Sequence, residues 1–170
     1  MKLKFAKFWF RFFDKLMVRS SFPGLGKIAN KIRVFLGRRI SKTISKKAFI
    51  EKGAKFGPHT VVLDYGCIGI NCDLGDYVTI GMHTMMGPNC HFFASNHNRT
   101  EEKFEGMTEP KRIVLGDYSW VGYGCIFCAG AEIGNYTTVG AGSVVTKKFA
   151  DYCLVAGNPA TIKKDYKKNN

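Results

Sequence analysis

The stretch LGDYSWVGYGCIFCAGAEIGNYTTVGAGSVV, residues 115–145, carries an apolar residue at every sixth position. These residues are Leu115, Val121, Phe127, Ile133, Val139 and Val145. An earlier array with the same spacing runs through Ile50, Phe56, Val62, Ile68, Leu74, Ile80, Met86 and Phe92. A period of six residues fits neither a helix nor a simple alternating strand, and it is typical of a β-solenoid.

The residues between the apolar positions indicate how each repeat turns. The fourth residue after the apolar one is small or β-branched, at Ala54, Thr60, Gly66, Cys72, Val78, Thr84, Cys90, Ser119, Cys125, Ala131, Thr137 and Ser143. Glycine often comes directly after the apolar residue, as at Gly69, Gly87 and Gly122, and we expect it to supply the positive φ of a sharp corner. Three repeats then close a triangular coil, and coils stack about 4.8 Å apart. Each coil bonds only to its neighbours, so both ends need caps.

The distribution of charge divides the chain into two parts. The net charge is +13, and residues 1–50 hold 14 Lys or Arg against one acid, Asp14. Residues 51–170 hold 12 residues of each sign. No apolar run predicts a transmembrane helix, and basic residues among the N-terminal aromatic ones do not fit a signal peptide. We therefore expect a cytoplasmic protein, peripheral at the inner face of the membrane if its basic segment binds lipid.

The basic segment predicts two helices. Residues 3–17 have the pattern of a basic amphipathic helix, and residues 25–40 predict a second helix after a break at Pro23. The first helix suits an anionic membrane surface, and the alternative is that it packs on the solenoid or at a subunit interface. The second helix is expected to cap the solenoid. Nucleic-acid binding is not expected, because nothing else in the chain resembles a recognition module.

These patterns predict three segments. Residues 1–48 form the helical segment, residues 49–164 the β-helix domain, and residues 165–170 a tail. A polar and charged stretch, residues 98–114, interrupts the repeats and is expected to be extruded at a corner, with His97 at its root. Insertions of this kind in solenoids often carry function.

The residues around the interruption resemble a known family. Gly87-Pro88-Asn89 is followed, after seven residues, by His97 within an Asn-His-Asn segment. This pattern is similar to that of the galactoside and maltose acetyltransferases, and closer to that of capsular and exopolysaccharide O-acetyltransferases. Residues 66–164 resemble the same hexapeptide-repeat acyltransferases. The resemblance implies a mainly β protein, a left-handed parallel β-helix that forms a homotrimer and moves an acetyl group from acetyl-CoA to a sugar hydroxyl.

The resemblance gives His97 the role of general base. The imidazole of histidine titrates near neutral pH, so it can take the proton of a hydroxyl whose oxygen attacks a thioester carbonyl. One of the glutamates of the interruption is a candidate for orienting the ring. Asn71 and Asn89, 18 residues apart, are expected to stack one coil apart. They either bind the acceptor sugar near His97 or cap a corner.

The resemblance also implies a coenzyme site along the coils, between two subunits of the trimer. The residues carried over by position are Trp120, Gly122, Ala141, Thr146, Lys147 and Lys164. Two positions depart from the galactoside enzyme: Tyr123 replaces a serine, and Thr161 replaces an arginine. The phosphate contacts are therefore less closely matched than the groove for the pantetheine arm.

Six cysteines occur, and three of them, Cys72, Cys90 and Cys125, occupy the small position of the repeat. They predict compact buried thiols. Cys125 and Cys128 have CxxC spacing but no second pair, so a zinc or redox site is not expected there. Free thiols suit a reducing cytoplasm.

Other functions remain as alternatives. One alternative is an acetyltransferase whose acceptor is an amino sugar, serine or an antibiotic. A zinc enzyme of the carbonic anhydrase type would use His83, His91 and His97, which lack the close paired spacing expected of such ligands, so no metal is expected. A non-catalytic scaffold is the last alternative.

Overall fold

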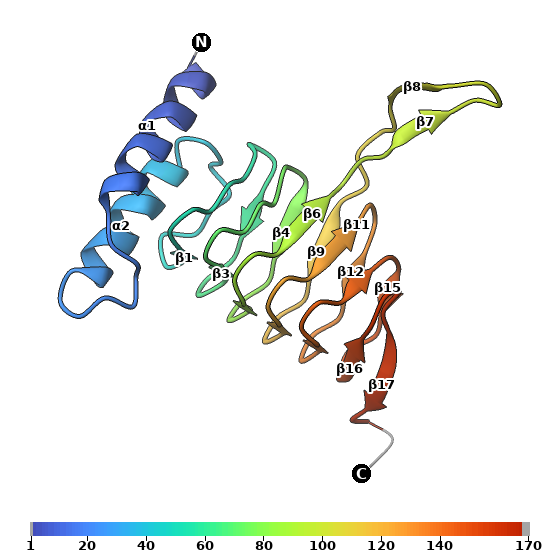
Figure 1. Ribbon diagram of the computed structural model, residues 1–170. Helices are drawn as coiled ribbons and strands as arrows, with labels where there is room; N and C mark the ends of the chain where they lie inside the picture. The colour runs from blue at the N-terminus through green and yellow to red at the C-terminus, as the bar shows by residue number, and fades with distance from the viewer. Residues whose placement is uncertain (1, 168–170) are drawn as a thin grey trace.

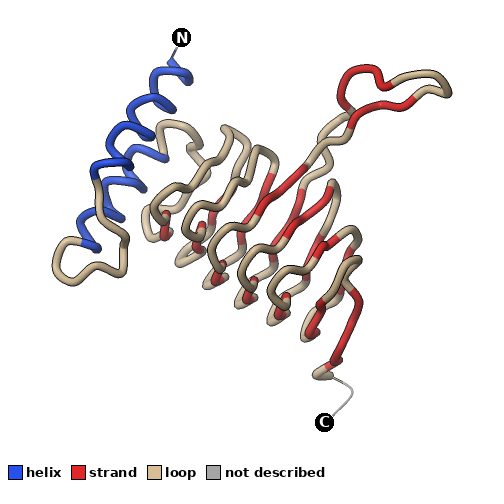
Figure 2. Tube along the Cα trace, in the orientation of Figure 1, coloured by secondary structure: helices blue, strands red, loops and turns tan. Residues whose placement is uncertain are grey.

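The computed structural model describes residues 2–167 of the chain (Figure 1). Its helices are α1 (Lys2–Leu16) and α2 (Gly26–Gly37). Its strands are β1 (Phe49–Ile50), β2 (Val61–Val62), β3 (Cys67–Ile68), β4 (Val78–Ile80), β5 (Met85–Met86), β6 (His91–Phe93), β7 (His97–Arg99), β8 (Phe104–Met107), β9 (Ile113–Leu115), β10 (Trp120–Val121), β11 (Ile126–Cys128), β12 (Glu132–Ile133), β13 (Thr138–Val139), β14 (Val144–Val145), β15 (Lys148–Phe149), β16 (Cys153–Ala156) and β17 (Thr161–Asp165). Short strands separated by corners wind the chain into a stack of coils (Figure 2).

The coils stack in parallel with a step of 18 residues, which pairs Phe49 with Cys67 and Val61 with Thr79. Three walls result, and we name them in the order in which the chain visits them. The first wall is formed by β2, β4, β9, β12 and β15. The second is formed by β5, β10, β13, β16 and β17, with β1 and β3 continuing it toward the N-terminus. The third is formed by β6, β11 and β14.

The interior confirms the six-residue period. Every apolar residue of both arrays is buried, and so is every residue of the small position. Burial of a Val, Leu, Ile or Phe side chain contributes about 1.5–3 kcal/mol, so the arrays supply the main apolar stabilisation of the stack. The coils begin earlier than expected, because Ile44, six residues before Ile50, is also buried and bridges to Val62.

Of the glycines that directly follow the apolar residues, only Gly75 has the positive φ expected of them. Positive φ otherwise occurs three residues after the apolar position, at Gly53, Tyr65, Asn71, Tyr77, His83, Asn89, Tyr118, Gly124, Gly130, Tyr136 and Gly142. Gly69 and Gly122 are required because the next coil is too close for a side chain. A Cβ atom at Gly69 would lie 2.4 Å from the carbonyl oxygen of Gly87, and one at Gly122 would lie 2.6 Å from the amide nitrogen of Ala141.

A column of aromatic rings follows the corner between the first and second walls. Its members are Tyr65, His83, Tyr118, Tyr136 and Tyr152. Neighbouring ring centroids are 4.7 to 5.1 Å apart and the rings are nearly parallel. This spacing follows from the distance between coils, since each ring comes from the same position of successive coils.

The two helices lie across the N-terminal end of the stack and close it (Figure 2). Phe10 packs its ring against Phe56 with centroids 5.2 Å apart. Arg33 is fully buried, and its Nε donates to a carboxylate oxygen of Asp14 at 2.6 Å. The other carboxylate oxygen of Asp14 accepts from the amide of Gly53 at 2.8 Å. This ion pair therefore joins α1, α2 and the first coil.

The interruption forms a hairpin of β7 and β8 that projects from the body at the corner between the third and first walls (Figure 1). It ends earlier than the expected range of 98–114. Ile113 already pairs with Val78 in the first wall, because Ile113 and Leu115 both fill the interior. The stack continues in register across the insertion, with Met85 paired to Trp120.

The C-terminal end is covered by β17, which turns back antiparallel to β16. The strand runs to Asp165, so the tail expected for residues 165–170 begins later than predicted. Residues 168–170 of that tail lie outside the described residues.

Removal of the buried guanidinium tests the role of the ion pair. We expect Arg33→Ala to lower the free energy of unfolding by about 3–5 kcal/mol, because it leaves the carboxylate of Asp14 buried without its cation. Lys55→Ala is the control, since it removes an exposed partner of Asp73 and should cost no more than about 1 kcal/mol. Urea unfolding followed by circular dichroism measures both values. Equal losses in the two variants would contradict the assignment.

A second prediction concerns the half-buried thiol of Cys67 on β3. Burial, and to a lesser extent the charge of Glu51, raises the pKa of this thiol to about 11. At pH 8 about one thiol in a thousand is then ionised, whereas roughly a quarter of free cysteine is. Alkylation of Cys67 by iodoacetamide should be slow at pH 8 and should rise about tenfold per pH unit up to pH 11. Peptide mass spectrometry measures it, with Cys67→Ser as control, and rapid labelling at pH 8 would overturn it.

Candidate active site

His97 lies at the neck of the hairpin, as the first residue of β7, and its side chain is exposed. Its Nδ1 is 3.3 Å from the carbonyl oxygen of Gly106. A carbonyl only accepts hydrogen bonds, so this contact assigns the proton to Nδ1 and leaves the lone pair on Nε2. The ring is thus held in the tautomer that a general base requires.

A backbone carbonyl, rather than a loop glutamate, is therefore the group that His97 contacts. Glu105 forms an ion pair with Lys103 at 2.6 Å instead. Gly106 has a φ of 60°, a left-handed conformation that glycine adopts without steric strain. Sequence reasoning missed Gly106, because an orienting carbonyl belongs to the backbone and has no side-chain signature.

Polar contacts hold the neck of the hairpin together. The amide of Asn96 donates to the hydroxyl oxygen of Thr108 at 2.9 Å, and the amide of Thr108 donates to the carbonyl of Asn96 at 2.7 Å. Below them, the amide of Lys111 donates to the carbonyl of Ala94 at 2.8 Å. These bonds position His97 relative to the third wall even though the hairpin projects into solvent.

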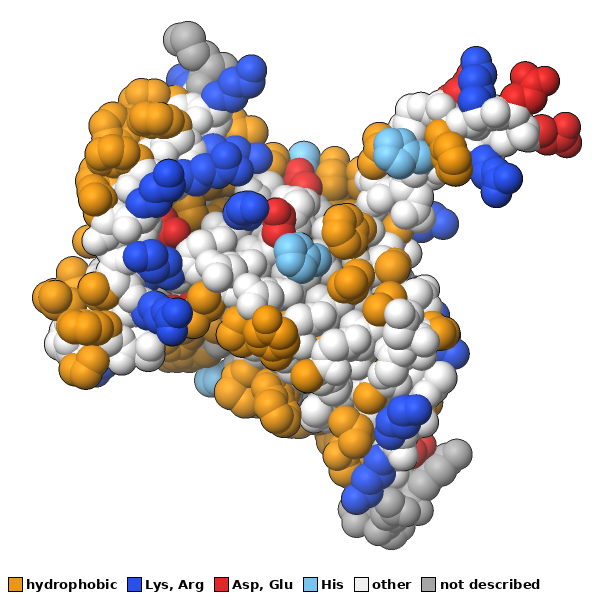
Figure 3. Space-filling model, viewed as in Figure 1, with side chains coloured by type: hydrophobic (Ala, Val, Ile, Leu, Met, Phe, Trp, Pro, Cys, Tyr) orange, Lys and Arg blue, Asp and Glu red, His pale blue; other side chains and the backbone are white. Residues whose placement is uncertain are grey.

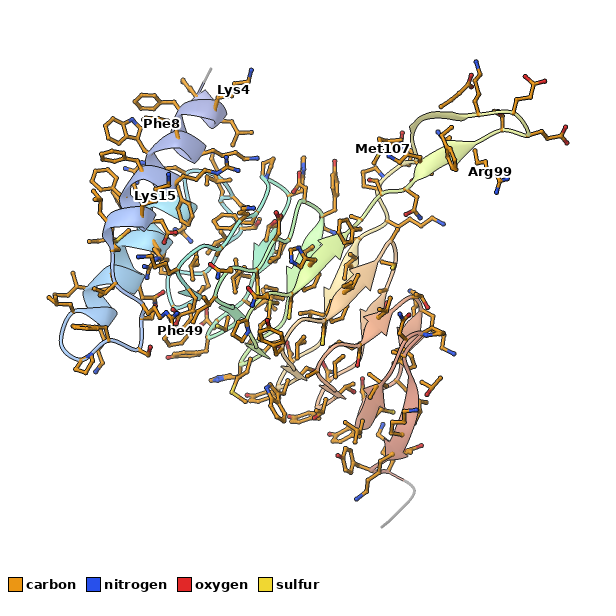
Figure 4. All side chains as sticks on the ribbon, in the orientation of Figure 1. Lys4, Phe8, Lys15, Phe49, Arg99 and Met107 are labelled. Atoms are coloured by element: carbon orange, nitrogen blue, oxygen red, sulfur yellow. The ribbon has the colours of Figure 1, made fainter. Side chains whose placement is uncertain are left out.

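The hairpin also exposes apolar side chains. Phe104 and Met107 on β8 are both exposed, and Phe93 is exposed at the end of β6. Figure 4 shows Met107 near the neck and Arg99 further along the projecting arm. Exposed apolar groups on the hairpin and at its base favour contact with another molecular surface.

The structure brings four of the six expected coenzyme residues together. Trp120 faces outward from the second wall with 54% of its surface exposed. Gly122 and Ala141 are stacked at the following corner, between the second and third walls. Lys164 lies on β17, paired with Leu154 beside the same wall. The groups that would meet an elongated ligand thus follow one side of the prism.

The other two expected coenzyme residues lie elsewhere in the chain. Thr146 and Lys147 follow β14 and lead into β15, at the corner between the third and first walls. They are exposed, as a ligand contact requires. A single chain does not bring them to the side that carries Trp120.

Asn71 and Asn89 are stacked one coil apart, as their spacing predicts. Both lie at the corner between the second and third walls, with φ of 54° and 58°. Asparagine tolerates this left-handed conformation better than most residues, which is a structural reason for its presence there. His97 lies at the opposite side of the third wall, whose width of about four to five residues is roughly 15 Å. One chain therefore does not bring the asparagines to His97.

The cysteines and the remaining histidines are dispersed. Cys72, Cys90 and Cys125 are buried as predicted, and Cys128 is half-buried on the third wall. Residues 2–167 contain no group of three or more His, Cys, Asp or Glu side chains arranged to hold a metal ion.

The three histidines considered as zinc ligands lie in different places. His83 is stacked between Tyr65 and Tyr118, His91 lies on the third wall, and His97 is on the hairpin. The three histidines therefore do not form a cluster within one chain.

Comparison with known proteins agrees with this architecture. The family model described as bacterial transferase hexapeptide (six repeats) matches residues 112–147. The putative colanic acid biosynthesis acetyltransferase WcaF of Escherichia coli (strain K12) is 30% identical over 135 residues, which cover 76% of this chain and 72% of WcaF.

Two solved structures have a similar fold. The maltose O-acetyltransferase from Clostridium difficile 630 matches with a TM-score of 0.76 and 22% identity, covering 96% of this chain and 86% of that one. A galactoside acetyltransferase in complex with coenzyme A matches with a TM-score of 0.66 and 21% identity, covering 96% of this chain and 80% of that one. Both alignments include nearly all of the present chain.

The sequence match to WcaF extends well beyond the hexapeptide segment, over about three quarters of each protein. The two structural matches confirm the parallel β-helix expected from the six-residue period. This chain therefore belongs to the hexapeptide-repeat acetyltransferases and folds as the left-handed parallel β-helix of that family.

Proposed function

We propose that the protein transfers an acetyl group from acetyl-CoA to a sugar hydroxyl, with His97 as the general base. The observation that carries the proposal is the hydrogen bond between Nδ1 of His97 and the carbonyl of Gly106. It leaves Nε2 on an exposed ring at the neck of the hairpin, free to accept a proton. The coenzyme complex of the related galactoside acetyltransferase supports acetyl-CoA as the acetyl donor.

The reaction follows from this arrangement. The acceptor oxygen attacks the thioester carbonyl while Nε2 of His97 takes the hydroxyl proton. When the tetrahedral intermediate collapses, the carbon–sulfur bond breaks and the imidazolium returns the proton to the departing thiolate. The products are the acetyl ester and free coenzyme A. The carbonyl of Gly106 stabilises the imidazolium during the transfer, because it accepts the Nδ1 proton in both states of the ring.

We propose that the complete site forms between copies of the chain, in the homotrimer that the family resemblance implies. His97 and Trp120 lie on different sides of one prism, so a second copy is needed to bring a base to the coenzyme. Exposed apolar side chains support this contact on both surfaces, with Phe104 and Met107 on the hairpin and Met85 beside Trp120 on the second wall.

In this arrangement the second wall holds the coenzyme. Trp120 offers an exposed aromatic surface to the pantetheine arm, and Gly122 and Ala141 lie close together at the adjoining corner. Lys164, together with Lys147 and Thr146 of an adjoining copy, provides contacts for the phosphates, which favour cationic and hydroxyl partners. Asn71 and Asn89 would reach an acceptor bound at His97 only where two copies of the chain meet.

The acceptor is proposed to be a saccharide of capsular, exopolysaccharide or lipid-linked origin. The similarity to WcaF, whose name refers to colanic acid biosynthesis, supports a polysaccharide precursor. The protein would act in the cytoplasm, at the inner face of the membrane, with residues 3–17 as its peripheral contact. The charge of the N-terminal segment supports this location.

Substitution of the proposed base is the direct test. We expect His97→Ala to lower kcat by a factor of about 10²–10⁴, the usual contribution of a general base, while the Kd for coenzyme A changes little. His59→Gln is the control, because His59 is exposed two coils nearer the cap and its ring contacts Asp76 and Tyr77 rather than the hairpin. Release of free thiol from acetyl-CoA with a panel of oligosaccharides measures turnover. Unchanged kcat in His97→Ala would end the assignment.

A second variant tests the coenzyme surface. Trp120→Ala should raise the KM for acetyl-CoA about tenfold or more and change kcat less, because it removes a binding surface and leaves the base in place. Phe49→Ala is the matched control, since Phe49 is an exposed aromatic residue facing outward from the same wall three coils nearer the cap. If both variants bind acetyl-CoA as the unmodified protein does, the second wall is not the coenzyme surface.

A further inference from the structure

The outer side of α1 carries a second apolar surface. Phe10 points inward and is buried, whereas Phe8 and Leu16 are 60% and 71% exposed. Phe5 and Phe12 are exposed on the same side as Phe8, at helical spacings of three and four residues. Figure 3 shows hydrophobic side chains along the outer edge of this helix, directed away from the coils. The packing of the cap therefore does not account for them.

The surface continues over the turn and onto α2. We define the cap face as nine of the exposed apolar residues of the two helices and their connection: Phe5, Phe8, Phe12, Leu16, Phe22, Leu25, Ile28, Ile32 and Phe35. On α2, Phe35 and Ile28 point away from the coils, opposite the buried residues Arg33 and Gly37. The cap face thus lies at one end of the prism, well away from the hairpin (Figure 1).

Positive charge surrounds this apolar surface. Lys4, Arg11 and Lys15 lie along one flank of α1, where Figure 3 shows a row of basic side chains beside the hydrophobic ones. The only acid in residues 1–50 is Asp14, which is buried and paired with Arg33. The surface therefore combines exposed aromatic groups with cations and exposes no carboxylate side chain.

A groove between the helices has the same character. Its volume is about 690 Å³, and Trp9, Phe13 and Phe35 are among its lining residues. Arg38 and Arg39 also line it, and the guanidinium of Arg39 lies 3.9 Å from the centre of the Phe35 ring. Apolar walls with guanidinium groups beside them suit a molecule with a hydrocarbon chain and a phosphate.

The chemistry of the cap face selects among possible occupants. A second copy of the cap would bring two strongly positive surfaces together, which is unfavourable. A nucleic acid would satisfy the cations but would not cover the row of phenylalanines. A bilayer with anionic lipids satisfies both, because aromatic side chains enter the boundary between headgroups and acyl chains while the cations contact phosphates. Neither helix is long and apolar enough to cross a bilayer, which agrees with a helix pair lying on the surface.

We propose that the cap face of both helices docks the protein on an anionic lipid bilayer, with the coils standing away from the membrane. His97 then lies three coils above the helices. With about 4.8 Å per coil and about 10 Å for the helix layer, its height above the bilayer surface is roughly 25 Å. This height, taken with the proposed acetyl transfer on which the inference rests, places the acetylated hydroxyl on a saccharide chain that extends from its lipid anchor. A sugar attached directly to the lipid would lie too close to the bilayer.

The test uses the full chain and vesicles of phosphatidylcholine with or without phosphatidylglycerol. We expect sedimentation with the anionic vesicles to be at least tenfold stronger than with phosphatidylcholine alone. A variant with Phe8→Asp and Phe12→Asp should lose binding at least tenfold. Ile162→Asp is the control, a change of the same kind at an exposed apolar residue near the opposite end of the prism. Binding that is equal in the double variant, or absent in the unmodified protein, would overturn the proposal.

A second variant and a second readout separate docking from catalysis. Lys4→Glu with Lys15→Glu keeps every aromatic residue and should also release the protein from anionic vesicles, so the test does not depend on one pair of substitutions. Both double variants should keep acetyl transfer to a soluble oligosaccharide within about twofold. His97→Ala should still bind vesicles. Loss of self-association, rather than of vesicle binding, in the phenylalanine variant would assign the cap face to a second copy instead.

Discussion

The coils of this protein stack as closely as they do because backbone meets backbone at one position of each repeat. Where Gly69 approaches Gly87, or Gly122 approaches Ala141, a single methyl group would overlap the next coil. The bulky residues can fill the interior only while that approach is kept. Because neighbouring coils are in such close contact, additional residues can be inserted at a corner, as the hairpin shows, but not within a wall. The coil at each end of the stack has a neighbouring coil on one side only. The helices cover the first coil, and β17 covers the last.

The period of the apolar residues was enough to predict the coils, their register and their interior, because burial depends on the position of each side chain within the repeat. It did not locate the positive φ, since Tyr65 and Asn71 adopt it as readily here as glycine does. The first coil was missed at Ile44, where basic residues surround a single apolar one. The motif made His97 the candidate base, whereas the Gly106 carbonyl that contacts it is a group that every residue type possesses.

The proposed base, His97, and the proposed coenzyme surface around Trp120 lie on different sides of one prism, so the proposed reaction requires two copies of the chain to associate. A hairpin that projects from one corner can meet a wall only if that wall belongs to a neighbour. In the proposed trimer, contacts between copies would occupy the sides of the prism. The helical end lies apart from the hairpin and from Trp120, so in the proposed assembly binding to a lipid surface and binding between subunits would use different residues.

The insertion lies at a corner while the stack continues in register on either side. The number of coils before the insertion therefore sets the distance between the helices and the histidine. Each additional coil between the helices and the hairpin would raise the histidine by about 4.8 Å without altering its neighbours. Relatives with more or fewer repeats before the insertion would therefore differ in reach and share the same chemistry. Variation in repeat number offers evolution a stepwise means of matching an enzyme to the length of its acceptor.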